Sequence, residues 1–95
     1  MQTLMLLLSL AAPPPLPPGA VALNEPGRYR LARSYDDTLE FYRKTLPRES
    51  VRWTGIVNSA SVKADHIELL ARDTPWSGIN IYETKGEVRI YFIKR

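Results

Sequence analysis

The stretch SYDDTLEFYRKTLP, residues 34–47, decides the fold because it carries the clearest helix signal in the chain. Ser34 is a good N-cap residue, and Asp36 and Asp37 follow where negative charge favours the positive end of a helix dipole. Pro47 cannot continue a helix. The stretch therefore predicts a helix from Ser34 to about Leu46.

The apolar side chains of this stretch share one side of the predicted helix. They recur at spacings of four, three and four residues, namely at Tyr35, Leu39, Tyr42 and Leu46. This spacing lines one helical face, which must be buried against another element. Arg43 and Lys44 lie in the last turn, where cations favour the negative end of the dipole.

Period-two alternation predicts strands on both sides of the helix. Before it, residues 28–33 alternate cationic and apolar side chains, which suits a short edge strand with Tyr29 and Leu31 turned inward. After it, the predicted strands are Val51–Asn58, Val62–Arg72, Gly78–Glu83 and Glu87–Ile93. Residues 64–72 also read as a short helix by periodicity, so that alternative stays open.

Turn residues separate these strands. Thr84-Lys85-Gly86-Glu87 places a glycine where a hairpin loop commonly needs positive φ, which predicts that the last two strands are antiparallel. Asn58-Ser59-Ala60-Ser61 and the segment Asp73–Gly78 are the other turn-rich connections.

Together these elements predict an α+β domain in the order β-α-β-β-β-β. One helix packs on a mostly antiparallel sheet of four to five strands. A single helix covers only one sheet face, so we expect the opposite face to be solvated or to serve as a contact surface. The residues expected on it are Arg52, Thr54, Arg89 and Tyr91.

The first 22 residues carry no charged side chain, whereas every Asp, Glu, Lys and Arg lies from Glu25 onward. The apolar run Leu4–Ala12 is followed by a small-x-small site, Ala20-Val21-Ala22, in the order of a secretory signal. The run is shorter than the roughly 20 apolar residues of a membrane-spanning helix. We expect residues 1–22 to direct export to the periplasm or the medium, with cleavage after Ala22. A mis-assigned start or a disordered proline-rich tail is the alternative.

Residues 23–95 are expected to form one small domain. A domain of this size buries only about 60% of the surface that its unfolded chain exposes, so its stability depends on the apolar core, a partner or self-association. The sequence has no cysteine, which excludes disulfides and thiol redox chemistry. The net charge of +3 permits weak attraction to anionic surfaces.

No group of residues demands catalysis. His66 is the only histidine, and strand alternation puts His66 and Glu68 on one face with Asp65 on the other. A zinc site normally has three or four protein ligands, so we predict no metal and no cofactor. Capping explains Asp36 and Asp37. A small metal-dependent enzyme centred on His66 and Glu68 remains the alternative.

Aromatic and basic residues are the binding candidates, and the sequence predicts Trp76, Arg52, Arg89 and Tyr91. The arginines alternate with rings on predicted strands, while Trp76 lies in a loop, where it either closes the core or stands exposed as an anchor. Cations interleaved with rings also occur in single-strand nucleic-acid binders, which usually concentrate more charge on one face. We therefore expect an exported, non-enzymatic module that binds a protein, peptide or envelope polymer.

The segment Asp37–Arg43 leading to Leu46, set between one strand and several more, resembles one module of the vicinal-oxygen-chelate (glyoxalase-like) group. That group places His or Glu ligands on its strands and usually joins two modules to form a site. The first strand here, residues 28–33, offers neither ligand. The resemblance implies a shared packing pattern, and no residue or activity is carried over.

Overall fold

The computed structural model describes residues 13–95, so the predicted apolar run Leu4–Ala12 lies outside the described residues. Within residues 13–95, no helix has both the length and the apolar character needed to cross a membrane. The elements are β1 (Val21–Ala22), β2 (Arg28–Leu31), α2 (Tyr35–Thr45), the short 3-10 turn η1 (Arg48–Ser50), β3 (Val51–Asn58), β4 (Val62–Leu69), β5 (Trp76–Thr84) and β6 (Glu87–Lys94).

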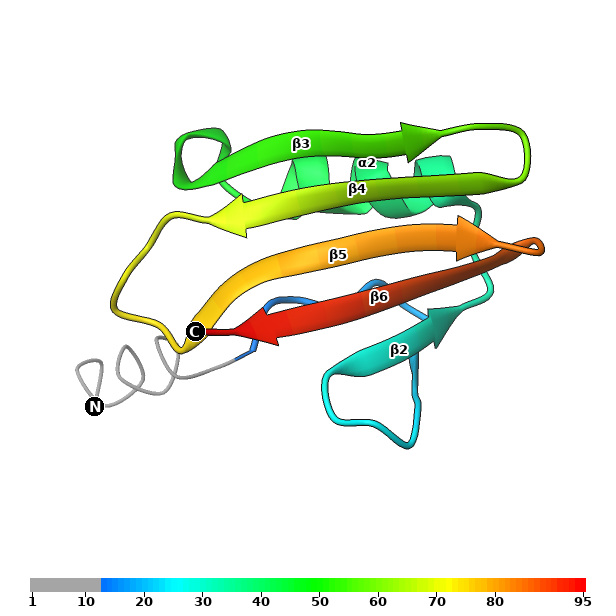
Figure 1. The fold of residues 1–95 in the computed structure, drawn as a ribbon. Helices are drawn as coiled ribbons and strands as arrows, with labels where there is room; N and C mark the ends of the chain where they lie inside the picture. The colour runs from blue at the N-terminus through cyan, green and yellow to red at the C-terminus, as the bar shows by residue number, and fades with distance from the viewer. Residues whose placement is uncertain (1–12) are drawn as a thin grey trace.

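The strands form one antiparallel sheet in the order β1-β2-β6-β5-β4-β3, with α2 packed on one face (Figure 1). The predicted α+β class is confirmed, but the predicted count of four to five strands is wrong. The additional strand is β1, in which Val21 pairs with Arg30 and Ala22 with Tyr29. Its two small apolar residues show no alternating pattern that would predict a strand. They are recognised as a strand only through their pairing with β2. Because β1 pairs with only part of β2, the rest of β2 is still an edge of the sheet.

Helix α2 connects the two sides of the sheet. Strands β2 and β3 run parallel to each other, with β6, β5 and β4 between them. The chain must therefore cross the sheet between β2 and β3, and α2 makes that crossing behind the strands in Figure 1. The crossover is right-handed, as nearly all such connections are.

The helix begins and ends where its residues predict. Ser34 is the N-cap, and its Oγ accepts a hydrogen bond from the backbone N–H of Asp37 at 3.1 Å. The Thr38 hydroxyl donates to the Ser34 carbonyl at 2.9 Å, which satisfies a fully buried polar group. At the other end the Leu46 N–H donates to the Tyr42 carbonyl at 3.0 Å, just before Pro47.

The core lies between α2 and the sheet. Alternate residues of the central strands point toward the helix and are almost completely buried, and each such aliphatic side chain contributes roughly 1.5–3 kcal/mol by leaving water. Tyr42 of the helix is fully buried against them. The buried strand residues are Leu31, Val51, Ile67, Ile79, Ile81, Val88, Ile90 and Phe92.

Residues 13–20, which we call the N-terminal strap, cover part of the core beside the helix. Figure 1 shows this segment passing behind β6, on the same side of the sheet as α2. Pro17 is buried, and Leu16 and Ala20 pack against the core. The Tyr42 hydroxyl donates to the Pro15 carbonyl at 2.8 Å. The strap is therefore packed as part of the folded domain, although the sequence suggests that these residues belong to a leader.

The predicted connections are present. Lys85 and Gly86 both have positive φ, at 54° and 74°, as a two-residue hairpin turn of the primed type requires. The Ser59 N–H donates to the Val62 carbonyl at 2.9 Å and closes the β3–β4 turn. The helical alternative for residues 64–72 is wrong, because β4 has a hydrogen-bonded neighbour on each side, β3 and β5.

Removing the strap should destabilise the domain. A chain that begins at Leu23 loses β1, the burial of Pro17 and the hydrogen bond from Tyr42, whereas a chain that begins at Pro13 keeps all three. We expect a difference of roughly 3–5 kcal/mol in the free energy of unfolding, measured by urea titration of the two chains. Equal stability would show that the strap contributes nothing to the fold.

Candidate ligand-binding face

The sheet face opposite α2, which we call the open face, carries no helix or loop of residues 13–95 over its strands (Figure 1). Its side chains alternate along each strand with those of the core. It is rich in arginine, tyrosine and polar groups. Its residues are Arg28, Arg30, Arg52, Thr54, Val57, Val62, Ala64, His66, Glu68, Gly78, Asn80, Tyr82, Thr84, Glu87, Arg89, Tyr91 and Ile93.

The strand registers arrange these side chains in rows across the sheet. The central row runs Arg28, Tyr91, Asn80, His66, Thr54, each residue directly opposite the next. The Arg28 guanidinium carbon lies 4.2 Å from the centroid of the Tyr91 ring, which is a close cation–π contact. The row therefore presents a cation, a ring, an amide and an imidazole in one line.

His66 lies close against the sheet at the middle of this row. Its Nδ1 is 2.6 Å from Asn80 Oδ1, and with the amide oxygen accepting, Nδ1 donates the proton. Gly78 leaves the space for the imidazole, because a Cβ at that position would come within 2.7 Å of His66 Cε1. The glycine and the amide together fix the orientation of the ring.

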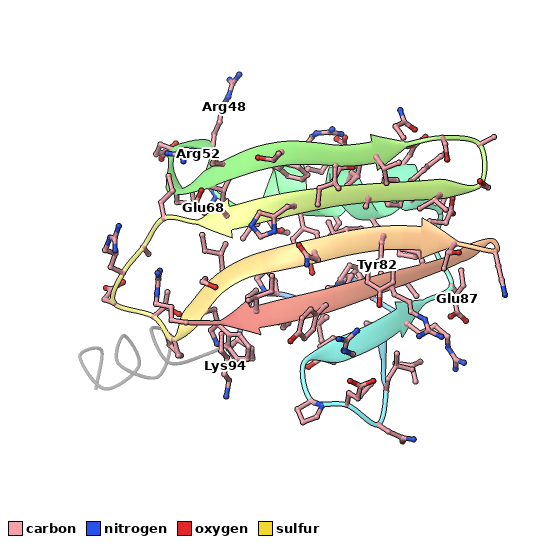
Figure 2. The ribbon with its side chains drawn as sticks, in the orientation of Figure 1. Arg48, Arg52, Glu68, Tyr82, Glu87 and Lys94 are labelled. Atoms are coloured by element: carbon pink, nitrogen blue, oxygen red, sulfur yellow. The ribbon has the colours of Figure 1, made fainter. Side chains whose placement is uncertain are left out.

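Two ion pairs flank the central row, one on each side of it. Arg89 Nε donates to Glu87 Oε2 at 2.6 Å, and this hydrogen bond raises the pKa of Arg89 further above its already high ordinary value. At the other end of the sheet, Arg52 Nη1 lies 3.2 Å from Glu68 Oε1. Figure 2 shows Arg52 and Glu68 together at one end and Tyr82 and Glu87 toward the opposite end. Both pairs are partly exposed, so they orient side chains more than they stabilise the fold.

The structure places three of the four predicted binding residues on the open face, namely Arg52, Arg89 and Tyr91. Arg52 is three strands away from Arg89 and lies toward the other end of the strands, so the two do not share one contact point. Tyr91 lies next to Arg89 along β6. The open face is thus a broad surface with charge at both ends.

Trp76 lies on the opposite side of the sheet and is not brought together with the other three. Its ring packs edge-on against Phe92 with centroids 5.8 Å apart, and Lys94 Nζ lies 5.2 Å from its centroid. Within the described part of the chain, the indole Nε1 is buried without a hydrogen-bond partner. Trp76 thus closes the core at the end of the sheet, one of the two roles that its loop position suggests.

Sequence reasoning missed Tyr82, Asn80, Arg28 and Arg30 as members of this face. A signal for the first two was present, because the predicted hairpin turn at Lys85-Gly86 fixes the register of β5 against β6. That register puts Tyr82 opposite Arg89 and Asn80 opposite Tyr91. The pairing of β2 with β6 spans most of the chain, and no local pattern reports it.

A separate cleft of about 580 Å³ lies between the first turns of α2 and the far end of the β3–β4 hairpin. At its base the Tyr35 hydroxyl donates to Asp65 Oδ2 at 2.7 Å and also lies 3.2 Å from the Ile81 carbonyl. Burial, followed by the bond to Asp65, raises the pKa of Tyr35 far above its ordinary value. Tyr35 therefore stays neutral, and Asp65 is held as a structural acceptor.

Neither place assembles a metal centre from the described part of the chain. His66 and Glu68 share the open face as predicted, but His66 is bonded to Asn80 and Glu68 to Arg52. Within residues 13–95, no three His, Cys, Asp or Glu side chains gather where they could hold a metal ion. The arrangement presents hydrogen-bonding and stacking groups rather than a set of ligands.

Comparisons with known protein families, with characterised proteins and with solved structures found no match to this chain.

Replacing Gly78 tests the packing of His66. We expect Gly78→Ala to force the imidazole out of place and to cost about 1–3 kcal/mol of unfolding free energy, measured by chemical denaturation. In a His66→Ala background the same change should cost less, because only the 3.2 Å approach of the new Cβ to the Ile67 carbonyl then stays. Gly55→Ala is the matched control, because a Cβ there meets Asp65 Oδ1 at an ordinary 3.5 Å. Equal costs with and without His66 would contradict this packing.

Alkaline pH should destabilise the fold through its buried tyrosines. Burial raises the pKa of both Tyr35 and Tyr42, so the folded chain favours the neutral phenol. This stability is complete below the ordinary phenol pKa of about 10 and is lost as the pH rises above it, at roughly 1.4 kcal/mol per pH unit for each tyrosine. Tyr42→Phe should flatten the decline in unfolding free energy between pH 10 and 11. Parallel curves for variant and parent would contradict the expectation.

Proposed function

We propose that this chain is a non-enzymatic binding module that holds an extended ligand on the open face. The observation that carries the proposal is the central row, in which Arg28 stacks on Tyr91 and continues through Asn80 and His66 across the sheet. A surface with rings, amides and fixed cations in line offers stacking and hydrogen bonds to a chain-like ligand.

The charges of the open face favour a ligand with anionic groups. Four arginines, Arg28, Arg30, Arg52 and Arg89, project from it, and three of them are paired with glutamates: Arg28 with Glu25, Arg52 with Glu68 and Arg89 with Glu87. Arg30 is the fourth cation and lies beside Arg89. Arginine forks suit carboxylates in particular. We infer an acidic peptide or an anionic envelope polymer as the ligand class.

Export is the second part of the proposal, and it rests on the sequence of residues 1–22. An apolar run ahead of a small-x-small site is typical of secretory signals. A cut after Ala22 would separate the strap from the domain, so the residue at which the isolated protein begins bears on both stability and location. Mass spectrometry of the intact protein from its own cells, fraction by fraction, tests this part. An unprocessed chain in the cytosolic fraction would contradict it.

Ligand binding should depend on the stacked pair at the end of the central row. We expect amide shifts of β5 and β6 when poly-glutamate or alginate is titrated into labelled protein, and a loss of affinity of about tenfold in Arg28→Ala or Tyr91→Ala. Arg43→Ala is the matched control, because Arg43 also lies over a ring, that of Trp53, but on the helix side.

The control series separates the alternatives. A response to oligothymidylate alone, with a strong salt dependence, would favour nucleic-acid binding over the proposed class. Shifts confined to the cleft around Tyr35 and Asp65 would place the site elsewhere. Equal losses in Arg43→Ala and Arg28→Ala would mean that the open face has no special role.

A further inference from the structure

Among the described residues, 13–95, strand β3 is a long free edge of the sheet. It is the last strand in the sheet order, and it lies along the upper border in Figure 1 with no further strand beyond it. Most of its eight residues are exposed, including Ile56 at 61%. Its composition is mainly β-branched and aromatic, with one charge and no proline. Apart from a bulge between Gly55 and Val57, it lacks the devices that usually keep an edge from pairing.

The hydrogen-bond pattern shows which backbone groups of this edge are unpaired. The Leu70 N–H donates to the Ser50 carbonyl at 3.0 Å, and these two residues continue the register of Val51 opposite Leu69. In an antiparallel pair, bonded and non-bonded residue pairs alternate. Arg52 and Thr54 therefore bond inward to β4. The N–H and C=O groups of Val51, Trp53 and Gly55 point outward.

We propose that the occupant of this edge is a second copy of the chain, paired antiparallel through β3 about a two-fold axis at Trp53. In that register Trp53 faces Trp53 of the second copy, and Val51 faces its Gly55. All three outward residues of each copy then exchange backbone hydrogen bonds with the other, up to the point where the bulge interrupts the strand. A shift by one residue would leave these groups unpaired.

Charge along the edge favours the same antiparallel arrangement. Arg43 and Arg48 lie beside the beginning of β3, in a cleft lined also by Val51 and Trp53 and reached by Asp65 from the neighbouring strand β4. Asp36 and Asp65, with Lys63, lie beside its end. A two-fold axis at Trp53 places the beginning of one β3 against the end of the other. The basic end of each copy then meets the more acidic end of its neighbour, which makes the edge self-complementary.

The pairing has a consequence for the open face. A two-fold axis between antiparallel edge strands stands perpendicular to the sheet, so both open faces turn to the same side. Arg52 of one copy then lies directly opposite Thr54 of the other, at the centre of a continuous sheet. An extended ligand could cross from one copy to the next, although the pairing itself does not depend on the proposed ligand.

Charge at Thr54 provides the test, because Thr54 is exposed and its new partner is Arg52 of the second copy. We expect sedimentation equilibrium of the full chain to show a monomer–dimer equilibrium. Thr54→Glu should lower the dimer dissociation constant and Thr54→Arg should raise it, each by about 2- to 30-fold at low salt because two symmetric cross-strand pairs change. Thr84→Glu and Thr84→Arg are matched controls, since Thr84 is an exposed threonine at the end of β5.

Cysteine cross-linking tests the register itself, since the sequence has no native cysteine. Opposed residues in a non-bonded pair have Cα atoms about 4.5 Å apart, within disulfide range, whereas diagonal residues are about 7–8 Å apart. A mixture of Arg52→Cys and Thr54→Cys chains should therefore oxidise to a mixed dimer faster than either chain alone.

Two results would overturn the proposal. One is a chain that stays monomeric at a protein concentration of several hundred micromolar. In that case β3 does not pair with a second copy. The other is a dimer that responds equally to charge at Thr84 and at Thr54, which would place the interface elsewhere. The binding titrations on the open face read out separately, so the two proposals can fail independently.

Discussion

Burial of a single face of the sheet is the constraint on which the rest of this structure depends. A sheet of six strands with one helix has more apolar surface on its inner face than the helix alone covers. The strap completes the cover, with Pro17 buried and Tyr42 bonded to Pro15. Because all of the available cover lies on this side, the other face stays open, and its side chains are free to be polar.

This one-sided cover links the fold to the candidate site. The core holds Ile67 of β4 and alternate residues of β5 and β6, and the residues between them form the open face. His66, Asn80 and Tyr91 thereby become neighbours although they come from three strands. The same crossover that lets α2 cover the sheet leaves β3 at its border. Open face and free edge are two outcomes of one topology.

Local patterns predicted much of this arrangement. Interactions between residues close in sequence can be recognised from the sequence alone. Examples are the helix cap at Ser34, the helix end at Pro47 and the turn at Gly86. Alternation along β3 and β6 placed Arg52, Arg89 and Tyr91 on the face away from the helix. The helix register likewise identified Tyr42 as a core residue.

What the patterns did not show depends on contacts across the chain. β1 and the strap become part of the domain only through β2 and Tyr42, and their small apolar residues and prolines fit a leader as well as a cover. The role of Trp76 was ambiguous for the same reason. A tryptophan in a predicted loop looks the same in the sequence whether it packs against Phe92 or binds a ligand. The room that Gly78 leaves for His66 exists only once β4 and β5 are paired.

Tyrosine nitration of the full chain, mapped by mass spectrometry, tests the one-sided cover most directly. The five tyrosines are divided between the two faces of the sheet, so each reports on its own side. The account predicts that Tyr82 and Tyr91 are modified while Tyr35 and Tyr42 are protected. Modification of Tyr42 as readily as Tyr91, in chains shown to be folded, would contradict it.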